Sequence, residues 1–326
     1  MLITKTPYRI SFFGGGTDYP EWYRKNGGAF LSTTIDKYVY LTVRQLPSFS
    51  DSNYRIVWSK VETVNKIKHI QHNVVREMLN NFKLKTGMEV HYQGDLPARS
   101  GMGSSSSFVV GLMNSLLNIK KKNISKKNLA KKSIYFEQKI LNEVVGLQDQ
   151  ISATYGGFNK VDIDKKGNFR IKKIKITNKI QEFNKNLFLI FTGINRTANE
   201  IAGQYVSNLK NKEYEMKEIS SQVKEGESLL LSNRFDDFGH LLHEGWKLKK
   251  SLGKVITNKK IDDLYNFSLK NGALGGKILG AGGGGFMLLY VPKNKILSLK
   301  KKLKKITVIP FNFSKTGSEI LLNTEK

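Results

Sequence analysis

The residues best suited to chemistry lie in the stretch 95–108, which reads DLPARSGMGSSSSF. Two glycines, Gly101 and Gly103, are followed by four serines and an apolar run. Glycine lets the backbone turn sharply and pass close to a ligand. The serines stand where a helix should begin, and there unpaired backbone N–H groups and the helix dipole attract anions. The stretch is therefore a candidate phosphate cradle, although its spacing differs from the common G-x-x-x-x-G-K-[ST] loop.

The residues after the serines separate this interpretation from a flexible connector, the other common use of glycine and serine. Apolar residues recur there at positions 108, 109, 112, 113, 116 and 117. This spacing predicts a helix over 108–117, so the serines lead into ordered structure.

Three carboxylates and one arginine are further candidates. Glu137 shares a predicted helix face with apolar residues, and such a carboxylate needs a cation or a metal ion to offset its desolvation. An ion pair with a lysine would serve equally well. Asp149 lies between two glutamines and could be an active carboxylate or a helix cap. Asp18 follows three glycines and could accept hydrogen bonds from hydroxyl groups or close a turn. Arg9, inside a strand-like run, requires an anionic partner.

Elements of an α/β fold must position these residues, and a composition shift near residue 180 indicates a domain boundary. Ser125 is the expected N-cap of a long helix that carries Glu137. The expected strands are 2–13, a strand pair within 29–44, 54–58, 88–92, a hairpin over 161–176, 187–191, 286–291 and 306–311. The expected helices are 67–81, 108–117, 125–145, 198–209, 216–231, 235–252, 261–271 and 295–304.

Composition limits the class of protein. A chain of 326 residues suits two domains, and the absence of cysteine excludes disulfides and thiolate chemistry. No apolar run is long enough to span a membrane and no signal peptide begins the chain, so a cytoplasmic enzyme is expected. The net charge of +27 comes mainly from lysines and predicts a solvated surface that attracts small acidic substrates. An RNA-binding module is the alternative, but few aromatic residues accompany the lysine runs.

Three separated segments resemble the three motifs of the GHMP kinases: TPYRISFFGGGTDY (6–19), LPARSGMGSSSS (96–107) and KILGAGGGG (277–285). The resemblance implies an N-terminal domain of the ribosomal S5 domain 2-like kind over 1–180. It implies a ferredoxin-like α/β domain over 181–326. It also implies ATP, Mg²⁺ and a small-molecule sugar phosphate, bound in a cleft between the domains. A homodimer is one option for the oligomeric state, and neither nucleic acid nor a membrane is an expected partner.

The resemblance also implies roles for individual residues. Asp149 would be the catalytic base, with Arg9 beside it. Mg²⁺ would bind to Glu137 and Ser105, with Ser104 as the alternative to Ser105. The residues expected along the ATP phosphates are Arg99, Ser100, Gly101, Met102, Gly103, Ser104, Ser105 and Ser106. Those expected at the sugar are Gly15, Gly16, Thr17, Asp18, Gly282 and Gly283. The candidates for binding a phosphate group on the sugar are Lys37, Arg99 and Arg196.

Within the family, the segments GGGTDYP, DLPARSGMGSSSSF and GLQDQISATYGGF are most similar to kinases of D-glycero-D-manno-heptose 7-phosphate, and next to fucokinase-type domains. This resemblance implies phosphorylation of the anomeric O1 to give the 1,7-bisphosphate, for nucleotide-activated heptose and surface polysaccharide. A kinase of an unphosphorylated sugar is the alternative. Gly15 and Gly16 stand where galactokinases carry an acidic residue and a histidine, which argues against galactose. Arg99 replaces a usual glycine and could bind phosphate or pack against the loop.

Overall fold

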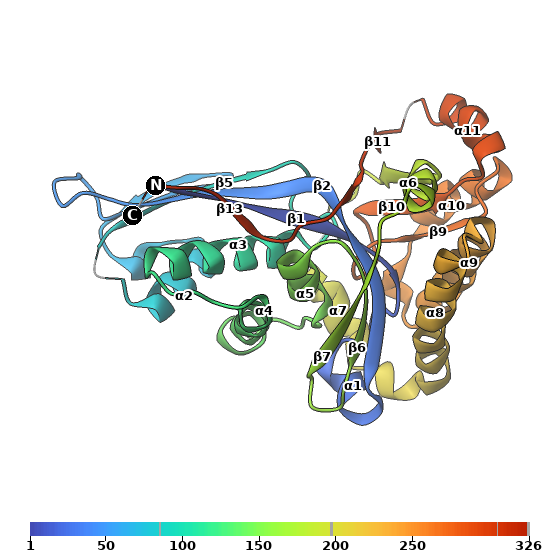
Figure 1. Ribbon diagram of the computed structural model, residues 1–326, viewed down its shortest axis with the longest axis horizontal. Helices are drawn as coiled ribbons and strands as arrows, with labels where there is room; N and C mark the ends of the chain where they lie inside the picture. The colour runs from blue at the N-terminus through green and yellow to red at the C-terminus, as the bar shows by residue number, and fades with distance from the viewer. Residues whose placement is uncertain (85, 196–197, 305, 325–326) are drawn as a thin grey trace.

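Two β-sheets organise the computed structural model, which describes residues 1–84, 86–195, 198–304 and 306–324 (Figure 1). The larger sheet has nine strands in the order β13-β1-β2-β5-β3-β4, with β12 and β6 also pairing with β2, and β7 pairing with β6. Its strands are β1 (Leu2–Phe13), β2 (Gly28–Gln45), β3 (Tyr54–Val57), β4 (Val61–Val64), β5 (Met88–Gly94), β6 (Phe158–Ile163), β7 (Phe169–Ile174), β12 (Phe313–Ser314) and β13 (Glu319–Asn323).

The segment expected as a strand pair within 29–44 is one long strand, β2, so this prediction is wrong. Its first part, 28–33, pairs with β6, and its second part, 39–45, pairs with β5. Different strands pair with the two parts, and β2 continues from one to the other without a turn. Strand β1 pairs with β2 in antiparallel orientation. No turn interrupts β2 where its neighbours change, so the segment does not divide into two strands.

Helix α3 (Ser104–Ile119) lies against the larger sheet and carries the serines at its start (Figure 1). All its side chains from Ser106 to Leu117 are buried, so it packs on every side, as central helices do. It contacts strands β1 and β2 on one side and α4 (Lys126–Tyr135) and α5 (Gln148–Tyr155) on the other. Helix α2 (Asn73–Phe82) lies nearby, preceded by a short 3₁₀ turn. The predicted helix over 108–117 is confirmed, with four further residues before it.

The long helix expected over 125–145 is broken. Ser125 caps its start as predicted, its hydroxyl accepting the Asn128 N–H at 3.3 Å. The α-helix ends at Tyr135 and continues as one π-helical turn, Phe136–Ile140. Irregular backbone then follows until α5 begins at Gln148. Glu137 therefore lies in a π turn, a feature frequent at functional sites.

The smaller sheet is antiparallel with the order β11-β8-β10-β9, and helices α8 and α9 lie beside it (Figure 1). Within the described residues, no helix is long and apolar enough to cross a lipid bilayer. The strands of the smaller sheet are β8 (Leu187–Phe191), β9 (Gly275–Ile278), β10 (Phe286–Tyr290) and β11 (Val308–Ile309). The remaining helices are α1 (Pro20–Asn26), α6 (Asn178–Lys185), α7 (Ala198–Val206), α8 (Glu213–Leu231), α9 (Phe235–Ser251), α10 (Lys259–Lys270) and α11 (Ile296–Lys302).

The end of the chain returns to the larger sheet. Strand β12 pairs with β2, and β13 pairs with the first residues of β1. The Ser318 hydroxyl lies 2.9 Å from that of Thr6, far away in sequence. The boundary near residue 180 therefore marks the first passage from one sheet to the other, and residues 313–323 belong with the first sheet.

Candidate functional site

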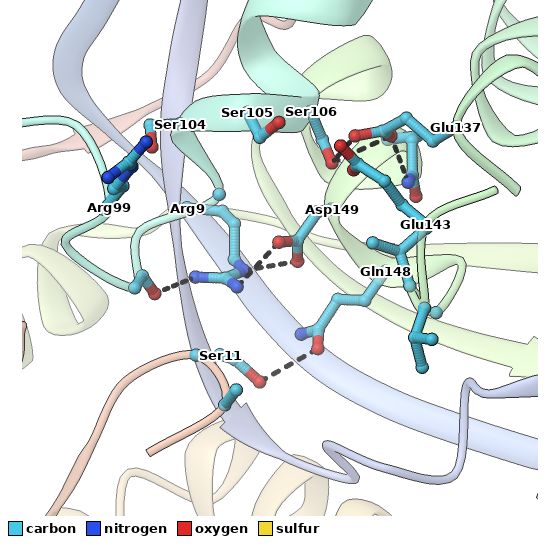
Figure 2. A pocket seen from close by; sticks show the side chains of 18 of the residues that line it. Arg9, Ser11, Arg99, Ser104, Ser105, Ser106, Glu137, Glu143, Gln148 and Asp149 are labelled. Carbon is cyan, nitrogen blue, oxygen red and sulfur yellow. Dashed lines mark hydrogen bonds and ion pairs between the residues drawn. The ribbon is translucent and has the colours of Figure 1, made fainter. Parts of the chain in front are cut away.

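A cavity of about 670 Å³ is lined by elements from both sheets. Strand β1, the start of α3, the π turn and the start of α5 supply one part of its wall. Helix α9 and the loop after β9 supply the other part. Figure 2 shows the side chains of Arg9, Asp149 and the three serines 104–106 around this space. Its volume is that of a typical site for a small molecule or a nucleotide.

Two glycines form the loop at the start of α3. Gly101 and Gly103 have φ of 79° and 77°, a left-handed backbone that favours glycine. A Cβ on Gly101 would lie 2.5 Å from the carbonyl oxygen of Leu279, so a side chain would separate this loop from the third glycine stretch. Gly103 is the N-cap residue of α3, and no side chain caps this helix start. The first turn of α3 therefore presents backbone N–H groups to the cavity, as a phosphate cradle requires.

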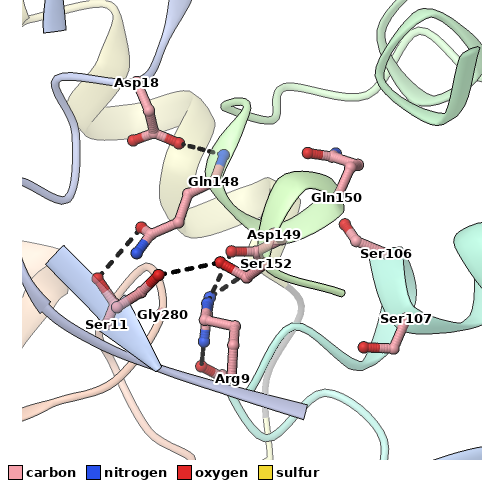
Figure 3. A network of polar contacts seen from close by, with 12 residues as sticks. Arg9, Ser11, Asp18, Ser106, Ser107, Gln148, Asp149, Gln150, Ser152 and Gly280 are labelled. Atoms are coloured by element: carbon pink, nitrogen blue, oxygen red, sulfur yellow. Dashed lines mark hydrogen bonds and ion pairs between the residues drawn. The ribbon is translucent and has the colours of Figure 1, made fainter. Parts of the chain in front are cut away.

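Asp149 and Arg9 form a bidentate ion pair beside this loop (Figures 2 and 3). The Arg9 Nε and Nη2 donate to the two Asp149 carboxylate oxygens at 2.7 and 2.8 Å. The Arg9 Nη1 donates to the carbonyl of Gly101 at 2.7 Å. The guanidinium therefore fixes Asp149 relative to the glycine loop. Arg9 is buried, whereas about 29% of the Asp149 side chain remains exposed to the cavity.

Glu137 is fully buried and accepts hydrogen bonds from neutral groups. The Ser106 hydroxyl lies 3.0 Å from both of its carboxylate oxygens, and the Gln150 amide donates to it as well. Burial raises the pKa of Glu137 to about 8. Among the described residues no lysine or arginine pairs with it, so it lacks the ion pair considered from the sequence. The hydroxyl that donates to Glu137 belongs to Ser106; Ser105, with Ser104 as its alternative, was expected as a ligand of Mg²⁺ beside Glu137, and that role stays a prediction.

These residues fit a magnesium ion. Mg²⁺ is usually held by one or two carboxylates together with substrate phosphates, and it keeps several waters. Glu137 and Glu143 both line the cavity close to the start of α3, and burial raises the pKa of both carboxyl groups. No group of three metal-ligating side chains occurs in the described ranges.

Asp18 lies elsewhere in the cavity wall and is held by backbone groups (Figure 3). Its two oxygens accept the N–H groups of Gly16 at 3.1 Å and Gln148 at 3.0 Å. A Cβ on Gly146 would lie 1.9 Å from this carboxylate, so the chain passes directly against it. Burial raises the pKa of Asp18 to about 6. The carboxylate is thus fixed in place with capacity left to accept hydrogen bonds from a ligand.

Gln148 and Ser11 were missed in the sequence. The Ser11 hydroxyl donates to the Gln148 side-chain oxygen at 3.1 Å (Figure 3), while the buried amide nitrogen of Gln148 has no partner among the residues that the structure describes. Both residues line the cavity between Asp18 and Asp149. No signal in the sequence distinguished them from ordinary polar residues.

Several expected residues do not line the cavity. Thr17 is buried, and its hydroxyl lies within hydrogen-bonding distance of the carbonyls of Gly14 and Ala29, which gives it a structural role. Met102 is fully buried in the core. Ser100 is also fully buried, and its carbonyl accepts the N–H of Phe286 at 3.1 Å.

The three candidates for binding a second phosphate differ in where they stand relative to the cavity. Lys37 pairs with Asp36 at 3.8 Å and is absent from the lining, and Arg196 lies outside the described residues. Gly282 packs against Ile256, so that Gly280 and Ala281 line the cavity in place of Gly282 and Gly283. Arg99 remains in the lining, exposed and with φ of 59°. This left-handed backbone is the physical reason why glycine suits the position.

Four aromatic side chains that the sequence analysis did not single out also line the cavity. The rings of Trp58 and His72 have centroids 4.9 Å apart, and His72 stacks on Phe108 at 5.0 Å. Tyr92 completes the group against Phe108. Burial lowers the pKa of His72, which favours the neutral imidazole. The four residues come from separate segments that only the fold brings together.

Comparisons with known proteins agree with this arrangement. The model of the GHMP kinases N terminal domain matches residues 65–157, and that of the GHMP kinases C terminal domain matches residues 227–306. The chain is 28% identical to a D-glycero-alpha-D-manno-heptose 7-phosphate kinase of Campylobacter jejuni, over 97% of both chains. It is 25% identical to a bifunctional fucokinase/GDP-fucose pyrophosphorylase of Arabidopsis thaliana, over 92% of this chain and 31% of that protein.

Among solved structures, a D-glycero-D-manno-heptose 1-phosphate kinase from Bacteroides thetaiotaomicron superposes with a TM-score of 0.79. The match covers 99% of each chain at 21% sequence identity, which supports the two-domain fold. The two family models together span more than half of this chain and include both the glycine–serine loop and the third glycine stretch. The chain therefore belongs to the GHMP kinase family, whose members transfer phosphate from ATP, typically with Mg²⁺, to an alcohol group.

Proposed function

We propose that this protein transfers the γ-phosphate of ATP to the anomeric O1 of D-glycero-D-manno-heptose 7-phosphate, giving the 1,7-bisphosphate. The observation that carries the proposal is the position of Asp149, clamped by Arg9 next to the exposed amides of α3. The activity named for the Campylobacter relative supports the choice of substrate.

The cavity offers a separate place for each part of ATP. The phosphates would lie along the amides of Gly103 and Ser104–Ser106, where the dipole of α3 favours negative charge. The adenine would lie against the aromatic group of Trp58, His72 and Phe108, since flat rings stack on such side chains. Arg99, exposed beside the loop, would lie within reach of the phosphates.

Phosphoryl transfer depends mainly on positioning and on neutralising charge. The acceptor hydroxyl would lie against Asp149, which takes its proton as the oxygen attacks the γ-phosphorus. The bond from that phosphorus to the β,γ-bridging oxygen breaks, and ADP leaves with the electron pair. Arg9 holds both Asp149 oxygens, yet each retains a further lone pair for the proton. An anomeric hydroxyl is more acidic than an ordinary alcohol, which eases this proton transfer. Asp18 would accept hydrogen bonds from other sugar hydroxyls.

Glu137 and Ser106 are the residues that would hold Mg²⁺, with Glu143 close by. The ion would supply positive charge against the phosphate oxygens. The chain's own contribution is a carboxylate that is oriented by Ser106 and Gln150 and that pairs with no lysine or arginine in the described part of the chain.

The direct test is an ADP-release screen of the purified protein over sugar phosphates and free sugars, with phosphorus NMR to locate the new ester. We expect turnover of the heptose 7-phosphate with a new signal from an anomeric phosphate. The Asp149→Asn variant is the matched control for contaminating kinases. A new ester at any other oxygen would contradict the proposal.

A kinase of an unphosphorylated sugar is the second candidate. It is favoured by the position of Lys37, which lies away from the cavity and cannot grip a phosphate on the acceptor. The fucokinase relative of Arabidopsis thaliana supports it as well. A higher kcat/KM for free heptose or fucose than for heptose 7-phosphate would decide in its favour.

A further inference from the structure

Lys277 is a buried cation that faces the cavity. It lies on β9 of the smaller sheet, and its Nζ donates to the carbonyl of Phe12 on β1 of the larger sheet at 2.8 Å. Only about 8% of the residue is exposed, and it forms part of the cavity wall. An ammonium group has three N–H donors. Within the described part of the chain, one of the three has a partner and no carboxylate pairs with Lys277.

Such a group is costly unless something compensates it, because a buried charge loses its hydration. Burial, together with repulsion from the Arg9 guanidinium, lowers the pKa of Lys277 to about 7. Arg9 donates to both carboxylate oxygens of Asp149 and to the Gly101 carbonyl. The Asp149 carboxylate is therefore paired with Arg9 and not with Lys277. The positive charge of Lys277 is therefore not balanced by an anion among the described residues. A negatively charged group of a ligand could balance it.

The position of Lys277 indicates what that ligand group is. Strand β9 runs directly into the loop whose Gly280 lies against Gly101, where an added Cβ would be 2.7 Å from the Gly101 Cα. Phe12 lies three residues after Arg9 on the strand that carries the clamp for Asp149. Lys277 thus reaches from the strand that leads into the contact with the phosphate loop to the strand that carries Arg9, the partner of Asp149.

We propose that the ammonium of Lys277 binds phosphoryl oxygens at the acceptor side of the cavity, which makes it a substrate-contacting residue. This inference rests on the proposed kinase function. Two sources supply the same chemistry: the γ-phosphoryl group during transfer, and a phosphate carried by the acceptor. Both place an anion against the two N–H donors that have no partner.

The test compares Lys277→Met with the wild-type protein, using MgATP with heptose 7-phosphate and with free heptose. Methionine keeps the length and apolar stem of lysine and removes the charge. Lys247→Met, on the exposed surface of α9, is the matched control and should behave as wild type. If Lys277 binds the γ-phosphoryl group, kcat falls about 100-fold with both acceptors while both KM values change little. If it binds the acceptor's phosphate, KM rises for heptose 7-phosphate alone.

A change of less than threefold with both acceptors would overturn the proposal. A second readout separates binding from a structural role: removing an uncompensated buried charge should leave the melting temperature equal or higher. Should the variant fail to fold, a crystal of the wild-type protein with MgADP, aluminium fluoride and the acceptor decides the matter. An Nζ more than about 4 Å from every fluoride and phosphate oxygen would end the proposal. Absence of any sugar turnover by the wild-type protein would instead refute the proposed function.

Discussion

Ser104, Ser105 and Ser106 occupy successive positions in the first turn of α3, so their side chains point about 100° apart. Which of them meets Glu137 depends on how the helix is rotated relative to the π turn. That rotation is set by packing around the whole of α3 and is not encoded in the spacing of the serines. The sequence therefore located the group of hydroxyls and the carboxylate but could not choose Ser106.

Ser106→Ala should raise the Mg²⁺ concentration required for half-maximal activity about 10- to 100-fold, the usual effect of losing a group that orients or joins a metal ligand. Ser105 is exposed and has no contact with Glu137, so Ser105→Ala is the matched control and should change this requirement less than threefold. Magnesium titrations at saturating ATP measure both. Equal effects of the two substitutions would contradict the assignment to Ser106.

Asp149→Asn should lower kcat by about 10²–10⁴-fold, the range expected when a general base is lost. The amide keeps the shape of the side chain, so binding of ADP, measured by calorimetry, should stay within threefold of wild type. A nearly normal kcat would show that another group takes the proton.

The pKa of Asp18, raised to about 6, predicts a pH dependence of sugar binding. Above this value the carboxylate is ionised and accepts strongly from sugar hydroxyls; below it the bound proton removes the charge. The KM for the sugar should therefore rise as the pH falls through 6, approaching about tenfold per pH unit for a single proton. Asp18→Asn should abolish this inflection, while any inflection from the substrate's own phosphate remains. A profile unchanged by the substitution would rule Asp18 out.

At the scale of elements, strands and helices with strong periodicity were predictable, and irregular segments were not. The helix over 108–117 and the hairpin over 161–176 followed directly from their patterns. The break after Tyr135 was not predictable, because no proline or glycine stands at that point of the sequence. The short strands β12 and β13 were missed, since their pairing partners lie at the opposite end of the chain.

The contact between two glycine loops gives a prediction at this scale. Gly101→Ala adds a Cβ that would lie 2.5 Å from the Leu279 carbonyl, so the loop must move away from the third glycine stretch. We expect the KM for ATP to rise at least about tenfold, because small displacements in a positioned site are costly.

Gly167→Ala is the matched control for this substitution. Gly167 also has φ of 79°, but it lies in the β6–β7 hairpin, away from the cavity. The strain from the left-handed backbone is common to the two variants, whereas the clash with Leu279 belongs to Gly101→Ala alone, so only Gly101→Ala should affect ATP. An equal KM for ATP in the two variants would show that the loop contact is unimportant.

At the scale of the whole molecule, the two sheets are joined by main-chain contacts and not only by side chains. The N–H of Phe286 on β10 donates to the carbonyl of Ser100 in the phosphate loop. Lys277 spans from β9 to β1, and the end of the chain returns to pair with β1 and β2. Length and composition predicted two domains but gave no measure of how firmly they are joined.

These contacts predict that the two sheets unfold together. Differential scanning calorimetry should show one transition whose calorimetric and van't Hoff enthalpies agree, since neither sheet keeps its contacts when the other is lost. MgADP should shift that single transition upward as a whole. Two resolved transitions, or a shift of only one of them, would show that the sheets are independent.

The place where Ser100 and Gly101 touch the third glycine stretch has a consequence for motion. A hinge needs freely rotating backbone between the bodies that it joins, and here bare main chain from one body is interlocked with bare main chain from the other. When the cavity opens or closes, the contact of Ser100 and Gly101 with the third glycine stretch should therefore stay fixed. Access to the nucleotide would then depend on movement of the parts of the cavity wall that lie farther from this contact. Slow amide hydrogen exchange at Phe286, undisturbed by nucleotide, would be the signature of such an anchor.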